Sequence, residues 1–181
     1  LTLKFADKVV GEIPIDALAT KAPIYDRKWT KTKLPEKKIK IKDLKKIKIE
    51  DALLKILSSP NHSNKSWVTN QFDQMVMADT IQRSGSDAAI IRIHKKNKGI
   101  AVTVDSSSNY CKAHPHTGGK QIVCENWRNL ISVGSQPIAI TNCLNFGNPE
   151  DPKVMGEFAE CLLGIKEACE FLDYPVVSGN V

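Results

Sequence analysis

Amide and hydroxyl side chains gather just after residues 137–140, and they are the residues of this sequence best suited to contact a ligand. Residues 137–140 form a short apolar run with β-branched side chains, which is typical of a buried strand. Polar donors and acceptors follow at its carboxyl end, on Thr141, Asn142, Asn145 and Asn148. A polar strand end that leads into a helix is a place where phosphate groups bind. The same residues are also typical of an Asx-rich turn without a ligand.

A second stretch of the same kind lies at residues 174–181. It is a short apolar run that opens into a small polar turn containing Gly179 and Asn180. If the two strands are neighbours in a sheet, their carboxyl ends present Asn142, Gly179 and Asn180 together. This juxtaposition is the main structural prediction for a site.

Weaker candidates lie upstream. Cys111, His114 and His116 have a spacing that could supply three zinc ligands, but no fourth ligand is nearby in sequence, so we expect the histidines to lie on a surface loop. Asp105 follows a predicted strand, where it could face a ligand or cap a turn.

A pair of glycines is a further, weak indication of a phosphate-binding site. Gly118 and Gly119 precede a run of helical periodicity, with Thr117 as the expected cap, so they could bring a helix N-terminus close to a phosphate. Lys120 and Arg128 could add phosphate contacts. Helix entry and a charged outer helix face explain these four residues equally well.

Composition limits the classes of protein that fit. The chain has 181 residues, of which 41% are hydrophobic, enough for one core with an appended segment. The five cysteines include no Cys-x-x-Cys pair, which favours reduced, mostly buried thiols and a cytoplasmic location. No apolar run is long enough to span a membrane.

The positive charge is concentrated at the front. Residues 1–60 hold 15 Lys and Arg against 8 Asp and Glu, whereas residues 61–181 hold 11 against 12. Ten lysines fall in residues 28–48, with Trp29 as the only aromatic residue among them. A nucleic-acid surface would mix in arginines and stacking aromatics, so the pattern favours a solvated connector and no nucleic-acid partner.

The predicted elements begin with an end strand and a connector. Residues 1–10 are predicted to be the last strand of a preceding domain. A short helix is expected over residues 49–57. Residues 66–72 could form one or two further helical turns, with Trp67 packed inward. The strand candidates that follow are 75–78, 88–93 and 99–104, the last two expected to pair as a hairpin. They are followed by a helix from about 117 to 133 that Gly134 should end, strand 137–140, a helix capped by Asp151 and Pro152, and a final strand. Glu160 and the other carboxylates of the last helix are expected off its apolar stripe, and Cys161 and Cys169 on it.

This order predicts an α+β fold, a mainly antiparallel sheet with helices on one face. Residues 1–60 are expected to be the end of a preceding domain and a basic connector with a short helix. Residues 61–181 are expected to be the subdomain that carries the candidate site.

Seven stretches carry a family resemblance, and they are residues 71–76, 85–92, 118–120, 125–129, 141–150, 167–169 and 175–181. In their wording, order and approximate spacing they closely resemble phosphoribosylformylglycinamidine synthase, the large synthetase subunit (synthase II) of purine biosynthesis. Residues 66–181 are covered well and residues 1–60 more loosely. The resemblance implies the N-terminal subdomain fold of aminoimidazole ribonucleotide synthetase-like proteins, near the start of the second half of a duplicated parent chain.

The resemblance also implies a function. The family is a carbon–nitrogen ligase that uses ATP and Mg²⁺ to activate the amide of formylglycinamide ribonucleotide, and ammonia from a glutaminase subunit then gives the amidine. The implied partners are that glutaminase subunit, a small accessory subunit and the other half of the parent chain. The implied contacts are Asn142 and Gly179 for ATP and Asn180 for the metal, with no catalytic residue within this piece, which alone should be inactive.

One departure from the family bears on that site. The family commonly has Asp at the position of Asn142, so a charge is lost while an acceptor oxygen of similar shape remains. Two alternatives stay open from the sequence: another ATP-using member of the same superfamily, and a non-catalytic basic binding module centred on residues 28–48.

Overall fold

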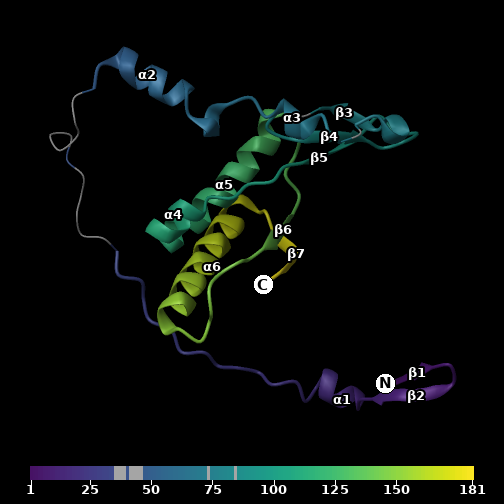
Figure 1. The fold of residues 1–181 in the computed structure, drawn as a ribbon. Coiled ribbons are helices and arrows are strands. Elements are labelled where there is room, and N and C mark those ends of the chain that lie inside the picture. Colours follow the sequence, from purple (N-terminus) through teal and green to yellow (C-terminus); the bar gives the residue numbers. More distant parts are fainter. Residues whose placement is uncertain (35–39, 41–46, 73, 84) are drawn as a thin grey trace.

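The computed structural model describes residues 1–34, 40, 47–72, 74–83 and 85–181. The chain begins with an antiparallel hairpin of β1 (Thr2–Phe5) and β2 (Lys8–Glu12), followed by the short helix α1 (Ile15–Leu18). The prediction of a single strand over residues 1–10 is therefore wrong. Ala6 and Asp7 both have positive φ, 46° and 62°, and this pair forms the tight turn that folds the stretch back on itself. The hairpin lies apart from the central helices (Figure 1).

The predicted helix over 49–57 is confirmed as α2 (Ile49–Leu57). The 3₁₀ helix η2 (Pro60–His62) and the single turn α3 (Ser66–Thr69) follow it. Trp67 was expected to pack inward, but 69% of its surface is exposed. Much of the lysine-rich stretch over residues 28–48, which is predicted to be a solvated connector, lies outside the described residues.

Three antiparallel strands form the next unit, in the order β3 (Thr80–Gln82), β4 (Ala89–Arg92) and β5 (Gly99–Val102). The β4–β5 hairpin confirms the predicted pairing of the two apolar runs. The strand predicted at 75–78 is wrong, because Val76–Ala78 forms the 3₁₀ helix η3. Met77 there has a φ of 55°, a left-handed conformation that an extended strand does not allow.

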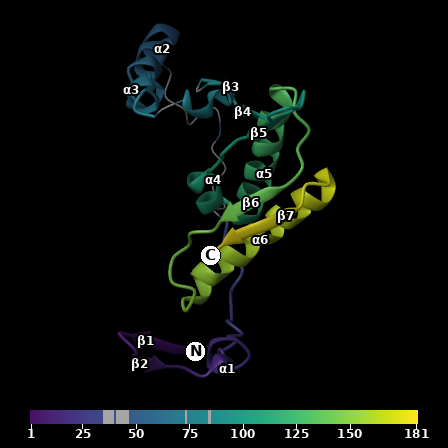
Figure 2. The same ribbon diagram turned by 90° about the vertical axis from the view of Figure 1, so that its right-hand side faces the viewer.

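Two long helices pack together and form the centre of the molecule (Figures 1 and 2). The short helix α4 (Ser108–Ala113) leads into α5 (Pro115–Ser132), and α6 is Pro152–Leu172. Asp151 caps α6 by accepting a hydrogen bond from the Lys153 N–H, as predicted from the Asp-Pro pair. Gly134, with a φ of +77°, follows α5 as the predicted C-terminal glycine.

The last two strands, β6 (Ile140–Cys143) and β7 (Val176–Asn180), form a parallel pair, and α6 connects them along the chain. The strand predicted at 137–140 starts only at its final residue, and Ile138 is 77% exposed. The register explains the shift, because β7 begins to pair with this stretch at Ile140.

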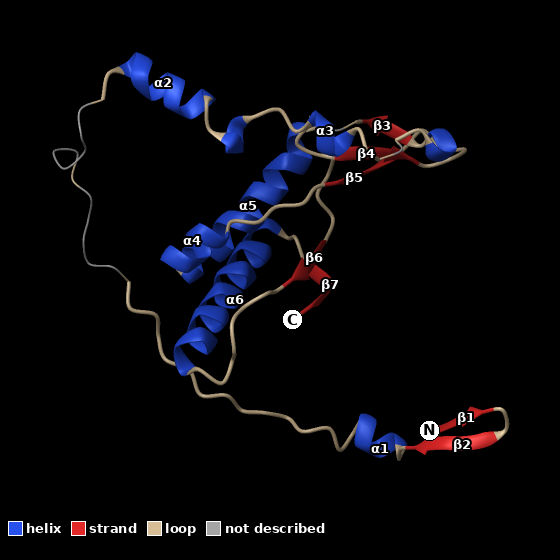
Figure 3. Cartoon of the chain, in the orientation of Figure 1, coloured by secondary structure: helices blue, strands red, loops and turns tan. Residues whose placement is uncertain are grey.

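The fold class is α+β, as predicted, and Figure 3 shows how its helices and strands are distributed. The described strands divide among three small sheets, two of them antiparallel and one parallel. The buried core lies between α5, α6 and the residues just before β4 and β7, and it consists of Ala88, Val123, Leu130, Ala168 and Tyr174. Across the described part of the chain, no helix has both the length and the apolar character needed to cross a membrane.

Candidate functional site

The carboxyl ends of β6 and β7 lie side by side. In the parallel register Asn142 is opposite Gly179 and Cys143 is opposite Asn180. The ladder extends one residue further, because the Leu144 N–H donates to the Asn180 carbonyl oxygen at 2.9 Å. The predicted juxtaposition of the two strand ends is therefore confirmed.

Gly179 has a steric reason to be glycine. The Asn142 side-chain oxygen lies where a Cβ on residue 179 would be, and the Asn142 carbonyl oxygen is close to the same point. Any other residue at 179 would displace the Asn142 side chain. The half-buried Asn142 amide and the exposed Gly179 backbone thus share one surface at the strand ends.

The turn after β6 is organised by its own asparagine side chains. The Asn148 Oδ1 accepts from the Glu150 N–H at 3.0 Å, an Asx turn that leads into the cap of α6. The Asn145 Nδ2 lies 3.3 Å from the Cys143 Sγ. Asn148 therefore has a structural role, and Asn142 and Asn180 are the amides that remain nearest the strand ends.

An apolar groove of about 300 Å³ adjoins these strand ends. Phe146 and Phe158 form one wall, packed edge to face with ring centroids 5.0 Å apart. The residues that line the groove are Leu144, Asn145, Phe146, Gly147, Pro149, Val154, Phe158 and Val181. A polar strand end beside an apolar groove is a common composition for a small-molecule site.

The glycine pair at 118 and 119 does not face a phosphate site. Helix α5 starts at Pro115 and its cap is His114, whose Nδ1 accepts from the Thr117 N–H at 3.3 Å, so the prediction of Thr117 as cap is wrong. Both glycines are buried one turn inside the helix, where they allow backbone contact. A Cβ on Gly118 would overlap α4 at Cys111, and one on Gly119 would overlap the backbone of α6.

The prediction of a surface loop around His114 and His116 is also wrong, since both residues belong to the start of α5 and Pro115 between them is fully buried. The His116 Nε2 lies 2.9 Å from Glu167, and Lys120 pairs with the same carboxylate. Hydrogen bonds from Lys120 and from His116 lower the pKa of Glu167.

No described residues support the zinc alternative. The described part of the chain has no group of three or more His, Cys, Asp or Glu side chains that could hold a metal ion. Cys161 is buried as predicted, and its Sγ lies 3.9 Å from that of Cys111. Burial raises the pKa of the Cys161 thiol to about 12, with smaller contributions from Cys111, so this thiol stays protonated.

The structure also shows a contact that the sequence pattern did not reveal. The connector segment, residues 27–34, lies along α6 in an extended conformation. The Thr30 N–H donates to the Pro152 carbonyl oxygen and the Thr32 N–H to the Glu160 Oε2, both at 2.9 Å, and Gly156 meets the Thr30 carbonyl. Two extended residues span about 6.6 Å and four helical residues about 6 Å, so alternate connector residues match a row of residues four apart on the helix.

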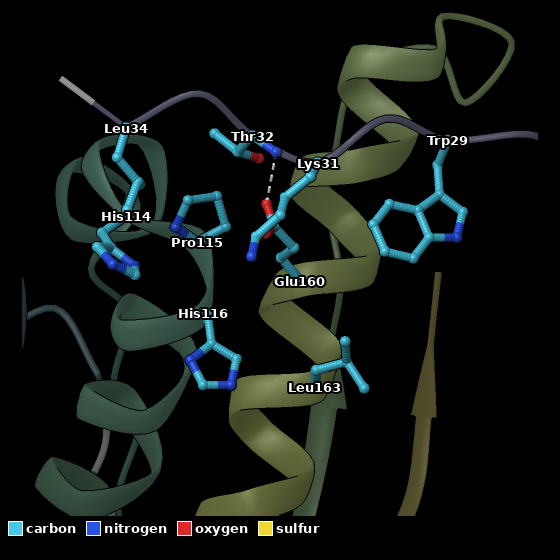
Figure 4. A pocket seen from close by; sticks show the side chains of 9 residues that line it. All are labelled: Trp29, Lys31, Thr32, Leu34, His114, Pro115, His116, Glu160 and Leu163. Atoms are coloured by element: carbon cyan, nitrogen blue, oxygen red, sulfur yellow. Dashed lines mark hydrogen bonds between the residues drawn. The ribbon is translucent and has the colours of Figure 1, made fainter. Parts of the chain in front are cut away.

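Glu160 accepts the central hydrogen bond of this contact. The sequence predicted that its carboxylate lies away from the apolar face of the last helix. Only 8% of the residue is exposed. Burial raises the pKa of Glu160, but the hydrogen bond from Thr32 and the nearby charges of Lys31 and His114 lower it by more, so the net pKa is below the ordinary value. The connector closes one side of a cavity of about 470 Å³ beside these residues (Figure 4).

Comparison with known proteins places this chain in a family. The family model for "AIR synthase related protein, N-terminal domain" matches residues 85–181, more than half of the chain. The chain therefore belongs to the AIR synthase related proteins. The predicted boundary between residues 60 and 61 remains a prediction.

Within that class the chain is similar to one kind of protein. It is 54% identical over 182 residues to phosphoribosylformylglycinamidine synthase subunit PurL of Pelagibacter ubique (strain HTCC1062), covering 100% of this chain and 25% of that protein. It is 48% identical to the same subunit of Rhodopseudomonas palustris (strain BisB5), covering 99% and 24%. The resemblance to this synthase is confirmed, and the chain spans about a quarter of the length of these relatives.

A solved structure supports the same conclusion. The structure described as T. maritima PurL complexed with ADP aligns with a TM-score of 0.68 at 31% identity, over 99% of this chain and 27% of that one. The ADP belongs to that protein.

Proposed function

We propose that this chain is part of an ATP-dependent phosphoribosylformylglycinamidine synthase, where it forms one wall of a nucleotide site at the paired ends of β6 and β7. The observation that carries the proposal is the register of Asn142 against Gly179, next to Asn180. The kinship with PurL and the ADP in the related structure support nucleotide as the ligand.

The local chemistry fits the polar and apolar parts of a nucleotide. Asn142 offers an amide that can both donate and accept, and the exposed backbone of Gly179 lies directly beside it. The groove beside Phe146 offers an apolar wall of the kind that suits a base. We therefore assign ATP contacts to Asn142 and Gly179.

Magnesium fits this site only as an ion that phosphates hold. Mg²⁺ is usually bound through one or two carboxylates together with substrate phosphates and water. The strand ends supply neutral amide oxygens, from Asn180 and Asn142, and β6 and β7 contain no carboxylate. Asn180 would thus be one ligand, and the ion would neutralise phosphate charge during transfer.

In the proposed reaction, the amide oxygen of formylglycinamide ribonucleotide attacks the γ-phosphoryl group of ATP, the bond to the β-phosphate breaks and ADP leaves. Ammonia then adds to the activated carbon and phosphate leaves, which gives the amidine. Residues of this chain would bind and orient the nucleotide, because phosphoryl transfer depends mainly on positioning and charge stabilisation. Ammonia from a glutaminase subunit, a small accessory subunit and a cytoplasmic setting complete the proposal.

The reaction is tested on the full-length subunit that contains this segment. Phosphate release from ATP is measured with ammonium, magnesium and formylglycinamide ribonucleotide present, and each is omitted in turn. We expect release only when all are present. Release that does not need the ribonucleotide would instead indicate another reaction of the same superfamily.

The site assignment is tested by Asn142→Ala in the same full-length protein. Loss of an uncharged hydrogen bond to nucleotide costs about 1 kcal/mol, so the KM for ATP should rise about fivefold. Asn97→Ala is the matched control, since Asn97 is exposed in the turn between β4 and β5. An unchanged KM in Asn142→Ala, with normal folding, would reject the assignment.

A further inference from the structure

A chain of polar side chains links the end of β5 to the start of β7. Asp105 accepts hydrogen bonds from the Asn126 Nδ2 at 3.1 Å and from the Asn129 Nδ2 at 3.0 Å. The Oδ1 of Asn126 accepts from the Tyr174 hydroxyl at 2.7 Å. Three segments, the loop after β5, helix α5 and the link between α6 and β7, thus meet in one network.

The chemistry of the network fixes its direction. An ionised carboxylate can only accept, so Asp105 turns the Asn126 amide nitrogen toward itself and the amide oxygen toward Tyr174. Tyr174 is only 2% exposed, and burial, with the nearby Cys169 and Asp105, raises the pKa of its hydroxyl, which keeps it a donor. The Asp105 carboxylate therefore fixes the orientation of the Asn126 amide, and the amide oxygen then accepts the hydrogen bond from the buried Tyr174 hydroxyl.

Tyr174 lies at the point where β7 is joined to β6. Its N–H donates to the Cys169 carbonyl oxygen at 3.0 Å, which ends α6. The next residue, Pro175, accepts from the Ile140 N–H at 2.9 Å, and the pairing that follows brings Asn142 opposite Gly179. A shift of Tyr174 would thus move one strand of the candidate site relative to the other.

We propose that Asp105 is a positioning residue for the nucleotide site, acting through Asn126 and Tyr174 on the alignment of β7 with β6. This inference rests on the proposed function, since it assumes nucleotide at the two strand ends. Asp105 itself need not touch the ligand, because its two carboxylate oxygens already accept from Asn126 and Asn129.

The test exchanges the two ends of the Asp105–Asn126 hydrogen bond in the full-length subunit. Asn126→Asp places two carboxylates face to face, where they repel. The double variant Asp105→Asn with Asn126→Asp restores every bond and reverses the direction of only one: residue 105 now donates to residue 126, while it still accepts from Asn129 and residue 126 still accepts from Tyr174. We expect Asn126→Asp to raise the KM for ATP about tenfold with kcat within about twofold, and the double variant to return it to normal.

Leu130→Ala is the control for a merely structural effect. Leu130 lies on the same helix, is buried in the core and takes no part in the network. Its loss should lower the amount of folded enzyme and leave the KM for ATP unchanged. The inference is overturned if Asn126→Asp leaves this KM unchanged, if the double variant fails to restore it, or if Leu130→Ala raises it equally.

The experiment separates this inference from the proposed function. If Asn142→Ala raises the KM for ATP and Asn126→Asp does not, the nucleotide site stands and Asp105 does not position it. If neither variant changes the KM for ATP, the assignment of nucleotide to these strand ends is rejected, and the inference about Asp105 is rejected with it.

Discussion

Gly164→Val should strongly destabilise the protein. A Cβ on Gly164 would overlap the backbone carbonyl oxygen of His116 in α5, and Gly119 of α5 meets the backbone of Cys161 in the same way. Each helix therefore has a glycine where the other helix's backbone comes closest. Because backbone cannot rotate away as a side chain can, the helices must separate, and overpacking of this kind costs about 3 kcal/mol.

The measurement is the free energy of unfolding from urea denaturation. Phe171→Val is the matched control, because Phe171 lies on the same helix and is 88% exposed, so the change should cost less than about 1 kcal/mol. Gly119→Ala is a milder second test, since alanine's better helix propensity offsets about 1 kcal/mol of the clash. Equal stabilities for Gly164→Val and Phe171→Val would contradict the close packing of α5 on α6.

Glu160→Ala should release the connector segment from α6. The Thr32 N–H would lose its acceptor, and an unsatisfied buried donor costs about 1–3 kcal/mol. Hydrogen exchange of residues 27–34, followed by mass spectrometry, should become faster by one to two orders of magnitude, about what that energy implies. Glu157→Ala, one turn earlier on α6, is the control and should leave this exchange rate unchanged.

The same contact should depend on pH in a defined direction. The folded pKa of Glu160 is below the ordinary value of 4.5: burial raises it, but the hydrogen bond from Thr32 and the nearby charges lower it by more. A depressed carboxyl pKa stabilises the folded contact above the unfolded pKa, and this stabilisation is lost as the pH falls through the folded value. Protection of the connector segment should therefore fall below about pH 4.5 in the wild type. Glu160→Gln should show no such dependence, and a wild type with pH-independent protection would exclude the ionised Glu160 contact.

Elements with strong local signals were predicted well. Asp151 and Pro152 define the start of α6, Gly134 follows the end of α5, and apolar periodicity gives the bounds of α2. These features depend on residues within a turn or two of each other, which a sequence displays directly. The paired strand ends were also predicted, since two similar strand-and-turn stretches separated by one long helix are typical of a parallel pair.

The errors fall where local signals compete with distant contacts. Met75–Ala78 has strand-like composition but adopts a left-handed turn at Met77. Thr117 is a good cap residue, yet His114 three positions earlier takes that role. In each case more than one local conformation is compatible with the residues, and packing selects among them.

The sequence by itself determined the main helices, the β4–β5 hairpin, the polar character of the two strand ends and the kinship with the synthase. Only the tertiary structure decided what Gly119, Gly164 and Glu160 do, how the connector segment lies on α6, and that Asp105 reaches Tyr174. Glu160 and Thr32 are 128 residues apart and Asn126 and Tyr174 are 48 apart. Helix periodicity and capping act over a few residues. Whether a carboxylate is buried, or whether a position must be glycine, depends instead on which distant segment packs against that residue.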